Sequence, residues 1–179
     1  MSSAIGSVTS NGKSLYQVFL QKGTDPSEVV DLIKSAIGHD YISPWSDEDD
    51  GTISAEFKAM SSQIETLKEH KGIVRMSKVE FPVQDVTTPQ GRRRFSETHY
   101  SLLPINRENK DQCNATGAIL KTILEDELRE SMTMNGRFGK WTAEMTDEQV
   151  AEVENLDGIR AVRRAYMGKR GPVRRRQGS

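Results

Sequence analysis

The chain has 179 residues, of which 35% are hydrophobic and 28% are charged, and its formal net charge is −1. Such a chain is long enough for one domain or two small ones, and its composition does not require disorder. Cys113 is the only cysteine, which excludes an intrachain disulfide, and no apolar run approaches the length of a membrane-spanning helix.

The N-terminal half predicts a first unit at residues 15–80, after a Ser- and Gly-rich segment at residues 1–14 that we expect to be disordered. Asp25 and Pro26 are typical of a helix start, and Asp50-Gly51 is typical of a hairpin turn. Alternating apolar residues predict strands, and apolar residues three or four positions apart predict helices. The predicted elements are a strand at 15–21, a helix at 27–37, strands at 40–45 and 52–58, a helix at 61–69 and a strand at 73–79.

Residues 81–97 are predicted to be an exposed linker, because they hold two prolines, a glycine and three consecutive arginines. A second unit is predicted at residues 98–167. In its last helix, Thr146 and Gln149 form a capping box, and Gly158 is expected to end that helix in a left-handed conformation. The predicted elements are a strand at 99–105, a helix at 113–130, a short strand at 132–134, a turn at Asn135-Gly136, a strand from 138, a helix from 147 and a strand from 159.

The two units repeat one pattern. Gly158 lies 86 positions after Gly72, and the same offset places Gln149 on Gln63. Each unit has the predicted order strand, helix, strand, strand, helix, strand. We therefore predict an α+β fold of two tandem ferredoxin-like units (βαββαβ), each an antiparallel sheet with its helices on one face.

Several short segments carry a family resemblance. They are Tyr16-Gln-Val-Phe-Leu20, Asp25-Pro26-Ser-Glu-Val, Phe57-Lys-Ala-Met60, residues 61–67 and Gly72-Ile-Val in the first unit, and residues 143–150 and 156–159 in the second. In this order they resemble the inhibitor-I9 family, the propeptide-type domain of subtilisin-like serine proteases. In that family the sheet docks on the protease, and the residues after the last strand enter the active site as a substrate-like strand. The resemblance implies a protein-binding module that acts as a protease inhibitor or as a propeptide-like chaperone.

Carried over to this sequence, the resemblance implies a subtilisin-like serine protease as partner. No protease domain follows in the chain, so we expect inhibition of a separate protease. A protease with an acidic cleft that cleaves at dibasic sites suits the basic end of this segment best. The implied partner-binding residues are Tyr166, Met167, Gly168, Lys169 and Arg170.

A second interpretation is a small biosynthetic enzyme with a pocket between the paired units, in which aromatic walls would surround a few polar groups. Neither interpretation includes a catalytic residue, a cofactor or a metal, since the three histidines lack partners at metal-ligand spacing. Cys113 is interpreted as a small residue at a helix start rather than a reactive thiol. The pocket residues would be His39, Tyr41, Trp45, Trp141 and Glu144.

Charge is distributed unevenly along the chain. Residues 47–50 form an acidic loop, interpreted as a solvated hairpin tip or a partner for the protein's own arginine clusters, and residues 168–179 form a basic tail that we expect to be disordered. Nucleic acid is expected to bind only non-specifically through this tail, because the sheets lack the aromatic run of an RNA-recognition domain. No membrane partner is expected. Without a signal peptide the protein is expected to be cytoplasmic, and the basic tail leaves a nuclear location open.

Overall fold

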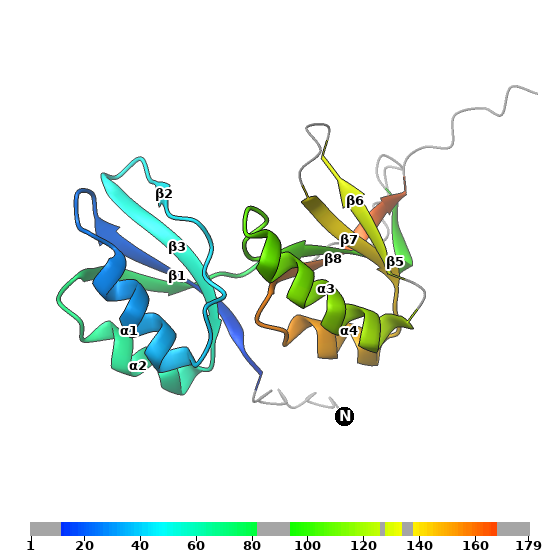
Figure 1. Cartoon of the computed structure of the whole chain (residues 1–179), viewed down its shortest axis with the longest axis horizontal. Coiled ribbons are helices and arrows are strands. Elements are labelled where there is room, and N and C mark those ends of the chain that lie inside the picture. The colour runs from blue at the N-terminus through cyan, green and yellow to red at the C-terminus, as the bar shows by residue number, and fades with distance from the viewer. Residues whose placement is uncertain (1–11, 82–93, 126–127, 134–137, 168–179) are drawn as a thin grey trace, which may run out of the picture. The chain divides into compact units, whose positions relative to one another are not determined.

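The computed structural model describes residues 12–81, 94–125, 128–133 and 138–167. The chain divides into two compact units, Met1–Glu80 and Phe81–Ser179. Over the described ranges each unit runs strand, helix, strand, strand, helix, strand (Figure 1). The predicted α+β class is therefore confirmed, with two four-stranded antiparallel sheets and four helices in the described part of the chain.

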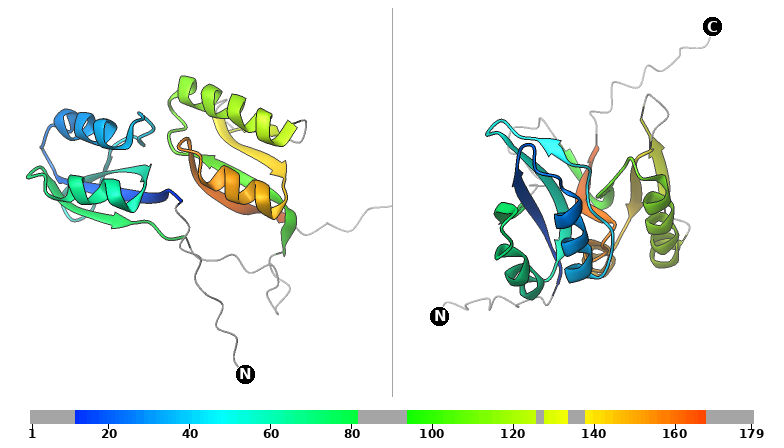
Figure 2. Two further views of the ribbon diagram at one scale, coloured as in Figure 1. Left: turned by 90° about the horizontal axis from the view of Figure 1, so that it is seen from below. Right: turned by 60° about the vertical axis from the view of Figure 1, so that its left-hand side comes forward.

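The strands of the first unit lie side by side in the order β2-β3-β1-β4, and β1 is antiparallel to both of its neighbours. Both helices pack on one face of this sheet, because their apolar side chains join a single core with those of β1 and β3 (Figure 2). In chain order the elements are β1 (Ser14–Gln21), α1 (Ser27–Ile37), β2 (Ser46–Asp47), β3 (Thr52–Ala59), α2 (Ser61–Lys68) and β4 (Ile73–Lys78).

The core of the first unit follows from two periodicities in the sequence. Alternate residues of β1, among them Val18 and Leu20, point toward the helices and are fully buried. In α1, Val29 and Ile33 lie four residues apart and form a buried stripe, as the spacing predicted. Phe57 of β3 completes this layer. Each such side chain contributes about 1.5–3 kcal/mol when it is removed from water.

The predicted strand at residues 40–45 is wrong. Only Ile42 forms an isolated bridge there, and β2 is the short segment Ser46–Asp47. Pro44 has no N–H to donate to a strand ladder, and the Ser43 hydroxyl accepts the N–H of Glu56 instead of leaving it to a backbone carbonyl. A side-chain hydrogen bond to β3 therefore takes the place of a regular ladder bond in this segment.

The strands of the second unit lie in the order β6-β7-β5-β8, the same arrangement as in the first unit. Its core is built around Trp141 of β7 and Leu102 of β5, which are both fully buried beneath Leu120 of α3 and Val153 of α4. In chain order the elements are β5 (Arg94–Pro104), α3 (Lys110–Leu124), β6 (Arg129–Met132), β7 (Phe138–Glu144), α4 (Asp147–Glu154) and β8 (Ile159–Met167).

Four predicted boundaries in the second unit are wrong. The predicted linker at residues 81–97 ends early, because β5 already begins at Arg94. The helix predicted at 113–130 begins at Lys110, since the Asn109 side chain accepts the N–H of Gln112 and caps the first turn at 3.1 Å. It ends at Leu124, and the following strand therefore starts before the predicted position 132. The predicted turn at Asn135-Gly136 lies outside the described residues.

Each unit has one glutamine that makes the same set of hydrogen bonds. In α2, Gln63 Oε1 accepts the N–H of Met60 at 2.8 Å, and in α4, Gln149 Oε1 accepts the N–H of Thr146 at 3.0 Å. The Nε2 groups donate to the last turn of the preceding helix, to Ala36 in α1 and to Ile123 in α3. The predicted capping box is confirmed, and the repeat extends from the sequence pattern to individual hydrogen bonds.

Gly158 does not adopt the predicted left-handed conformation, since the glycines with positive φ in the described residues are others. A glycine is needed here for a different reason. A Cβ at this position would overlap the side chain of Thr116 in α3. The missing side chain therefore lets α3 approach the turn before β8.

Candidate partner-binding site

The predicted partner-binding segment begins inside the sheet. Tyr166 and Met167 are the last residues of β8, and they lie opposite Phe95 and Arg94 of β5. Pairing with β5 holds these two residues in the ladder, so a segment that enters a partner has to follow them. The other predicted residues of this segment lie outside the described residues: Gly168, Lys169 and Arg170.

β8 is an edge strand, since in the sheets of the described residues it pairs with β5 alone. Its pairing is irregular near the end, because Phe95 lies opposite Tyr166 whereas Tyr100 lies opposite Arg164. The extra residues of β5 interrupt the ladder as a bulge does, and bulges redirect a strand. The last residues of β8 thus pair with the first residues of β5 beyond this interruption.

The open face of the second sheet, defined as the face opposite its helices, has a polar centre. Leu102 and Trp141 are paired and belong to the core, so their neighbours Ser101 and Thr142 point to the open face. Arg163 of β8 lies directly opposite Ser101 on the other side. Three adjacent strands therefore contribute hydroxyl and cationic groups to one surface.

A hydrogen bond connects two strands on the open face of the second sheet. Lys140 Nζ of β7 donates to Ser101 Oγ of β5 at 3.0 Å. An ammonium group has three donors, so this bond leaves two of them for other acceptors. Lys140 is half-buried, which places the charged group at the sheet surface rather than far out in solvent.

An aromatic ring lies beside the same strand. Phe81, the first residue of the second unit, has the guanidinium groups of Arg163 and Arg160 at 4.8 and 5.8 Å from its ring centre. Such cation–π contacts hold planar cations over a ring without neutralising their charge. Arg163 is therefore positioned while it keeps its full positive charge.

Three residues of the alternative pocket belong to the first unit. The N–H of Tyr41 donates to His39 Nδ1 at 3.2 Å, and His39 Nε2 lies 3.2 Å from the carbonyl oxygen of Lys58. Because Nδ1 accepts, Nε2 carries the proton and donates to that carbonyl. Trp45 is half-buried against the core of the unit. These contacts give His39 a structural part in ordering the segment that replaces the predicted strand.

The other two pocket residues belong to the second unit and lie on opposite faces of β7. Trp141 is fully buried in the core with the Phe138 ring 4.5 Å away, so it fills the core and is not a pocket wall. Gly117 of α3 makes room for it, since a Cβ there would lie 3.3 Å from the indole nitrogen. Glu144 is exposed and accepts the hydroxyl of Thr98 at 2.8 Å. The enzyme interpretation thus loses Trp141 and otherwise stays a prediction.

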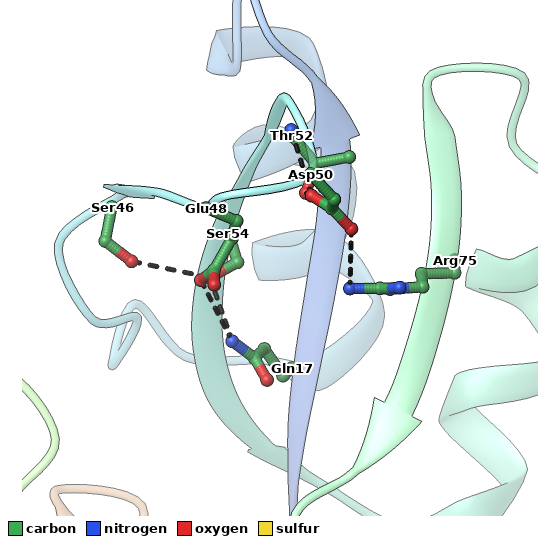
Figure 3. Close-up of polar contacts among 7 residues, drawn as sticks. All are labelled: Gln17, Ser46, Glu48, Asp50, Thr52, Ser54 and Arg75. Carbon is green, nitrogen blue, oxygen red and sulfur yellow. Dashed lines mark hydrogen bonds and ion pairs between the residues drawn. The ribbon is translucent and has the colours of Figure 1, made fainter.

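The acidic loop of the first unit pairs with basic side chains of that unit. Figure 3 shows Asp50 between Arg75 of β4, at 3.1 Å, and Thr52, whose hydroxyl and N–H both donate to it. The hydrogen bond from the Thr52 side chain is the largest cause that lowers the pKa of Asp50, and the Arg75 charge adds to it. Asp47 similarly pairs with Lys22 at 3.1 Å. Among the described residues these two acids thus pair with a lone arginine and a lysine of their own unit, and not with the arginine clusters that the sequence offered as partners.

Neighbouring side chains also fix the base of this loop. In Figure 3 the Ser54 hydroxyl donates to Glu48, and Gln17 Nε2 donates to Ser54 at 2.9 Å. Ser46 of β2 lies 3.4 Å from the same hydroxyl. Polar groups on the open face of the first sheet are thus largely satisfied by one another.

Cys113 has the environment of an unreactive thiol. It is buried in the first turns of α3, and its Sγ donates to the carbonyl oxygen of Asn106 at 3.4 Å. Burial, and next the negative charge of Glu130, raise the pKa of this thiol. Its interpretation as a structural residue is therefore supported, because the thiolate is the reactive form.

No protein-family model matches the chain, and no curated protein matches it in sequence. The fold defines a class only in coarse terms, an α+β chain of two similar units. None of the helices in the described ranges combines the length with the apolar character that crossing a bilayer requires. The functional argument therefore depends on the residues of the second unit.

Lys140 and Arg163 were not among the predicted site residues, and the sequence does not indicate that they lie near one another. Alternation along β7 and β8 gives the face of each residue, whereas the neighbour across the sheet depends on register. That register places Ser101 opposite Thr142 on one side and opposite Arg163 on the other. Ser101, the residue between the two cations, carried no signal of its own in the sequence.

Proposed function

We propose that the chain is a protein-binding module that inhibits, or assists the folding of, a subtilisin-like serine protease. In this proposal each βαββαβ unit is a ferredoxin-like unit of the inhibitor-I9 type. The second unit docks through its open sheet face, and the residues after Met167 enter the protease cleft. The topology of the two sheets and the hydrogen bonds that the units share support this assignment.

The position of β8 is the observation that carries the proposal. β8 is the last strand of its unit and lies at the edge of the described sheet, and the sequence continues directly from Met167 into Gly168, Lys169 and Arg170. A substrate-like strand adds to a protease through main-chain hydrogen bonds, which needs a segment that leaves its own sheet. The basic side chains of that segment favour a protease with an acidic cleft.

The experiment that tests this function compares the full chain with a chain ended at Met167. Both are titrated against a subtilisin-like protease that cleaves at dibasic sites, with cleavage of the chain itself followed on gels. We expect the full chain to inhibit the protease. The shortened chain should reach half-maximal inhibition only at a concentration at least about tenfold higher than the full chain, because it lacks the cleft-binding segment.

A matched variant and a second protease make this experiment specific. Lys169→Gln with Arg170→Gln keeps the chain length and should weaken inhibition nearly as much as the truncation. A trypsin-like protease, which also cleaves after basic residues but has another fold, should not be inhibited beyond simple substrate competition. Equal inhibition by the full and shortened chains would remove the exit segment from the proposal, and no inhibition by either chain would remove the protease.

A further inference from the structure

The open face of the second sheet carries three cations with no carboxylate partner among the described residues. Arg129 of β6 lies opposite Thr142, Lys140 bonds Ser101, and Arg163 lies opposite Ser101. Opposite residues in a sheet point to the same face, so the three charges share one surface. The contacts that the structure gives Lys140 and Arg163 are with a hydroxyl and an aromatic ring, and neither contact neutralises a positive charge.

The same positions of the first sheet carry no cation. Gln17 takes the place of Ser101, since Gln17 lies opposite Glu56 and Ser77 as Ser101 lies opposite Thr142 and Arg163. By the offset of 86 positions, Ser54 takes the place of Lys140. The two sheets thus share one arrangement of strands, and the unpaired cations are particular to the second one.

Two cations of the first unit, by contrast, have carboxylate partners within their own unit. Arg75 on β4 pairs with Asp50, and Lys22 pairs with Asp47. Half-buried cations without a counter-charge repel each other and lose part of their hydration. An arrangement that keeps such charges together on one face is typical of a surface that receives its counter-charges from a ligand.

We propose that the open face of the second sheet binds an acidic, extended segment of a partner protein. Lys140 and Arg163 lie on β7 and β8 with β5 between them, so about 10 Å separates their backbones. An extended peptide covers about that distance in three residues. Two carboxylates of one short segment therefore reach both cations, with the Arg163 guanidinium suited to a bidentate contact.

Hydroxyl groups complete this surface. Ser101 and Thr142 lie between the cations and offer donors and acceptors to the backbone of a bound peptide. Single-stranded nucleic acid is the less suitable ligand, because its bases need aromatic side chains on the central strands, and β5 and β7 present Ser101 and Thr142 there. The positively charged surface ends at Glu144, the last residue of β7, because its side chain is acidic.

This inference concerns the same open sheet face as the proposed function, but it depends on the charges of that face and not on a protease or on the segment after Met167, so either can fail without the other. The probe is a fluorescein-labelled decaglutamate peptide, titrated into the full chain at low ionic strength and followed by anisotropy. Lys140→Gln with Arg163→Gln should weaken binding about tenfold or more, because both charge-assisted contacts are lost. The matched control, Lys22→Gln with Arg75→Gln, removes two cations from the first unit and should leave the affinity within about twofold.

The location of binding separates the sheet face from the basic tail. In amide NMR spectra of the full chain, decaglutamate should shift the signals of Ser101, Lys140, Thr142 and Arg163. Shifts confined to residues 168–179, or an equal loss of affinity in the control variant, would overturn the proposal. Tighter binding of ten-nucleotide oligouridylate, lost in the Lys140→Gln, Arg163→Gln variant, would also overturn it and assign the face to nucleic acid.

Discussion

The two units fill the same arrangement of elements with different side chains. In the first unit β3 places Ala55 and then Phe57 in the core, whereas in the second β7 places Trp141 and then Ala143 at the matching positions. The large aromatic residue and the alanine are thus in reversed order. Gly117 in α3 accommodates the larger indole ring. Helix caps and the alternation of apolar residues in the strands specify the arrangement of elements. Within that arrangement the two units place their large and small core side chains at different positions.

The surfaces differ more than the cores. In the first unit the acids Asp47 and Asp50 pair with Lys22 and Arg75, so the loop and sheet neutralise one another. Among the described residues of the second unit, Lys140 and Arg163 on the open face have no such pairs. A duplicated arrangement therefore carries one internally satisfied surface and one surface with unneutralised charge. This difference assigns partner binding to the second unit.

The largest effect is expected from the two tryptophans, one in each unit. Trp141→Ala should lower the free energy of unfolding by about 3–5 kcal/mol, because it removes a fully buried indole and leaves a cavity. Trp45→Ala should cost about 1–2 kcal/mol, since Trp45 is only half-buried. Urea unfolding followed by far-ultraviolet circular dichroism measures both. Equal losses would mean that Trp141 is not the centre of its core.

The two matching glycines should respond differently to alanine. Gly158→Ala should cost about 3 kcal/mol, because the new Cβ overlaps Thr116. Gly72→Ala should change stability by less than about 1 kcal/mol, since its new contacts, with His70 and Val29, lie at 3.3 Å. Both are measured by urea unfolding. Thr116→Ala should recover part of the loss in Gly158→Ala, and an absence of any recovery would contradict the packing argument.

The two bridging glutamines should respond alike. Gln63→Ala and Gln149→Ala each remove a helix cap and a bond to the preceding helix, so each should cost about 1 kcal/mol. Thermal unfolding of the two variants measures both losses of stability. A loss of stability in only one of the two variants would contradict the structural equivalence of the two units. The exposed substitution Gln21→Ala in β1 serves as the control.

The smallest effect concerns the pH dependence of Cys113. Its pKa is raised in the folded protein, so above about pH 8.5 the unfolded chain releases the thiol proton more readily than the folded one. The wild type should therefore lose stability relative to Cys113→Ala as pH rises from 7 to 10, and not as it falls. A difference that stays constant with pH would contradict the raised pKa.

Capping and alternation made much of the fold predictable. The Thr146 and Gln149 capping box, the α1 stripe and the βαββαβ order are local patterns, and local patterns can be read from a sequence. The segment at residues 40–45 was not predictable in this way, because its fate depends on a hydrogen bond between Ser43 and the distant Glu56. The cluster around Ser101 depends on the register of three neighbouring strands, and alternation along a single strand does not encode register.

Hydrogen exchange of the full chain bound to a subtilisin-like protease, with the catalytic serine of the protease blocked, tests the central claim most directly. The claim is that the second unit binds the partner while the first unit keeps its charges satisfied internally. Binding should slow amide exchange in β8, on the open-face strands β5 and β7, and in residues 168–179, with β1 and β4 unchanged. Slowed exchange confined to the first unit, or unchanged exchange in β8, would contradict the claim.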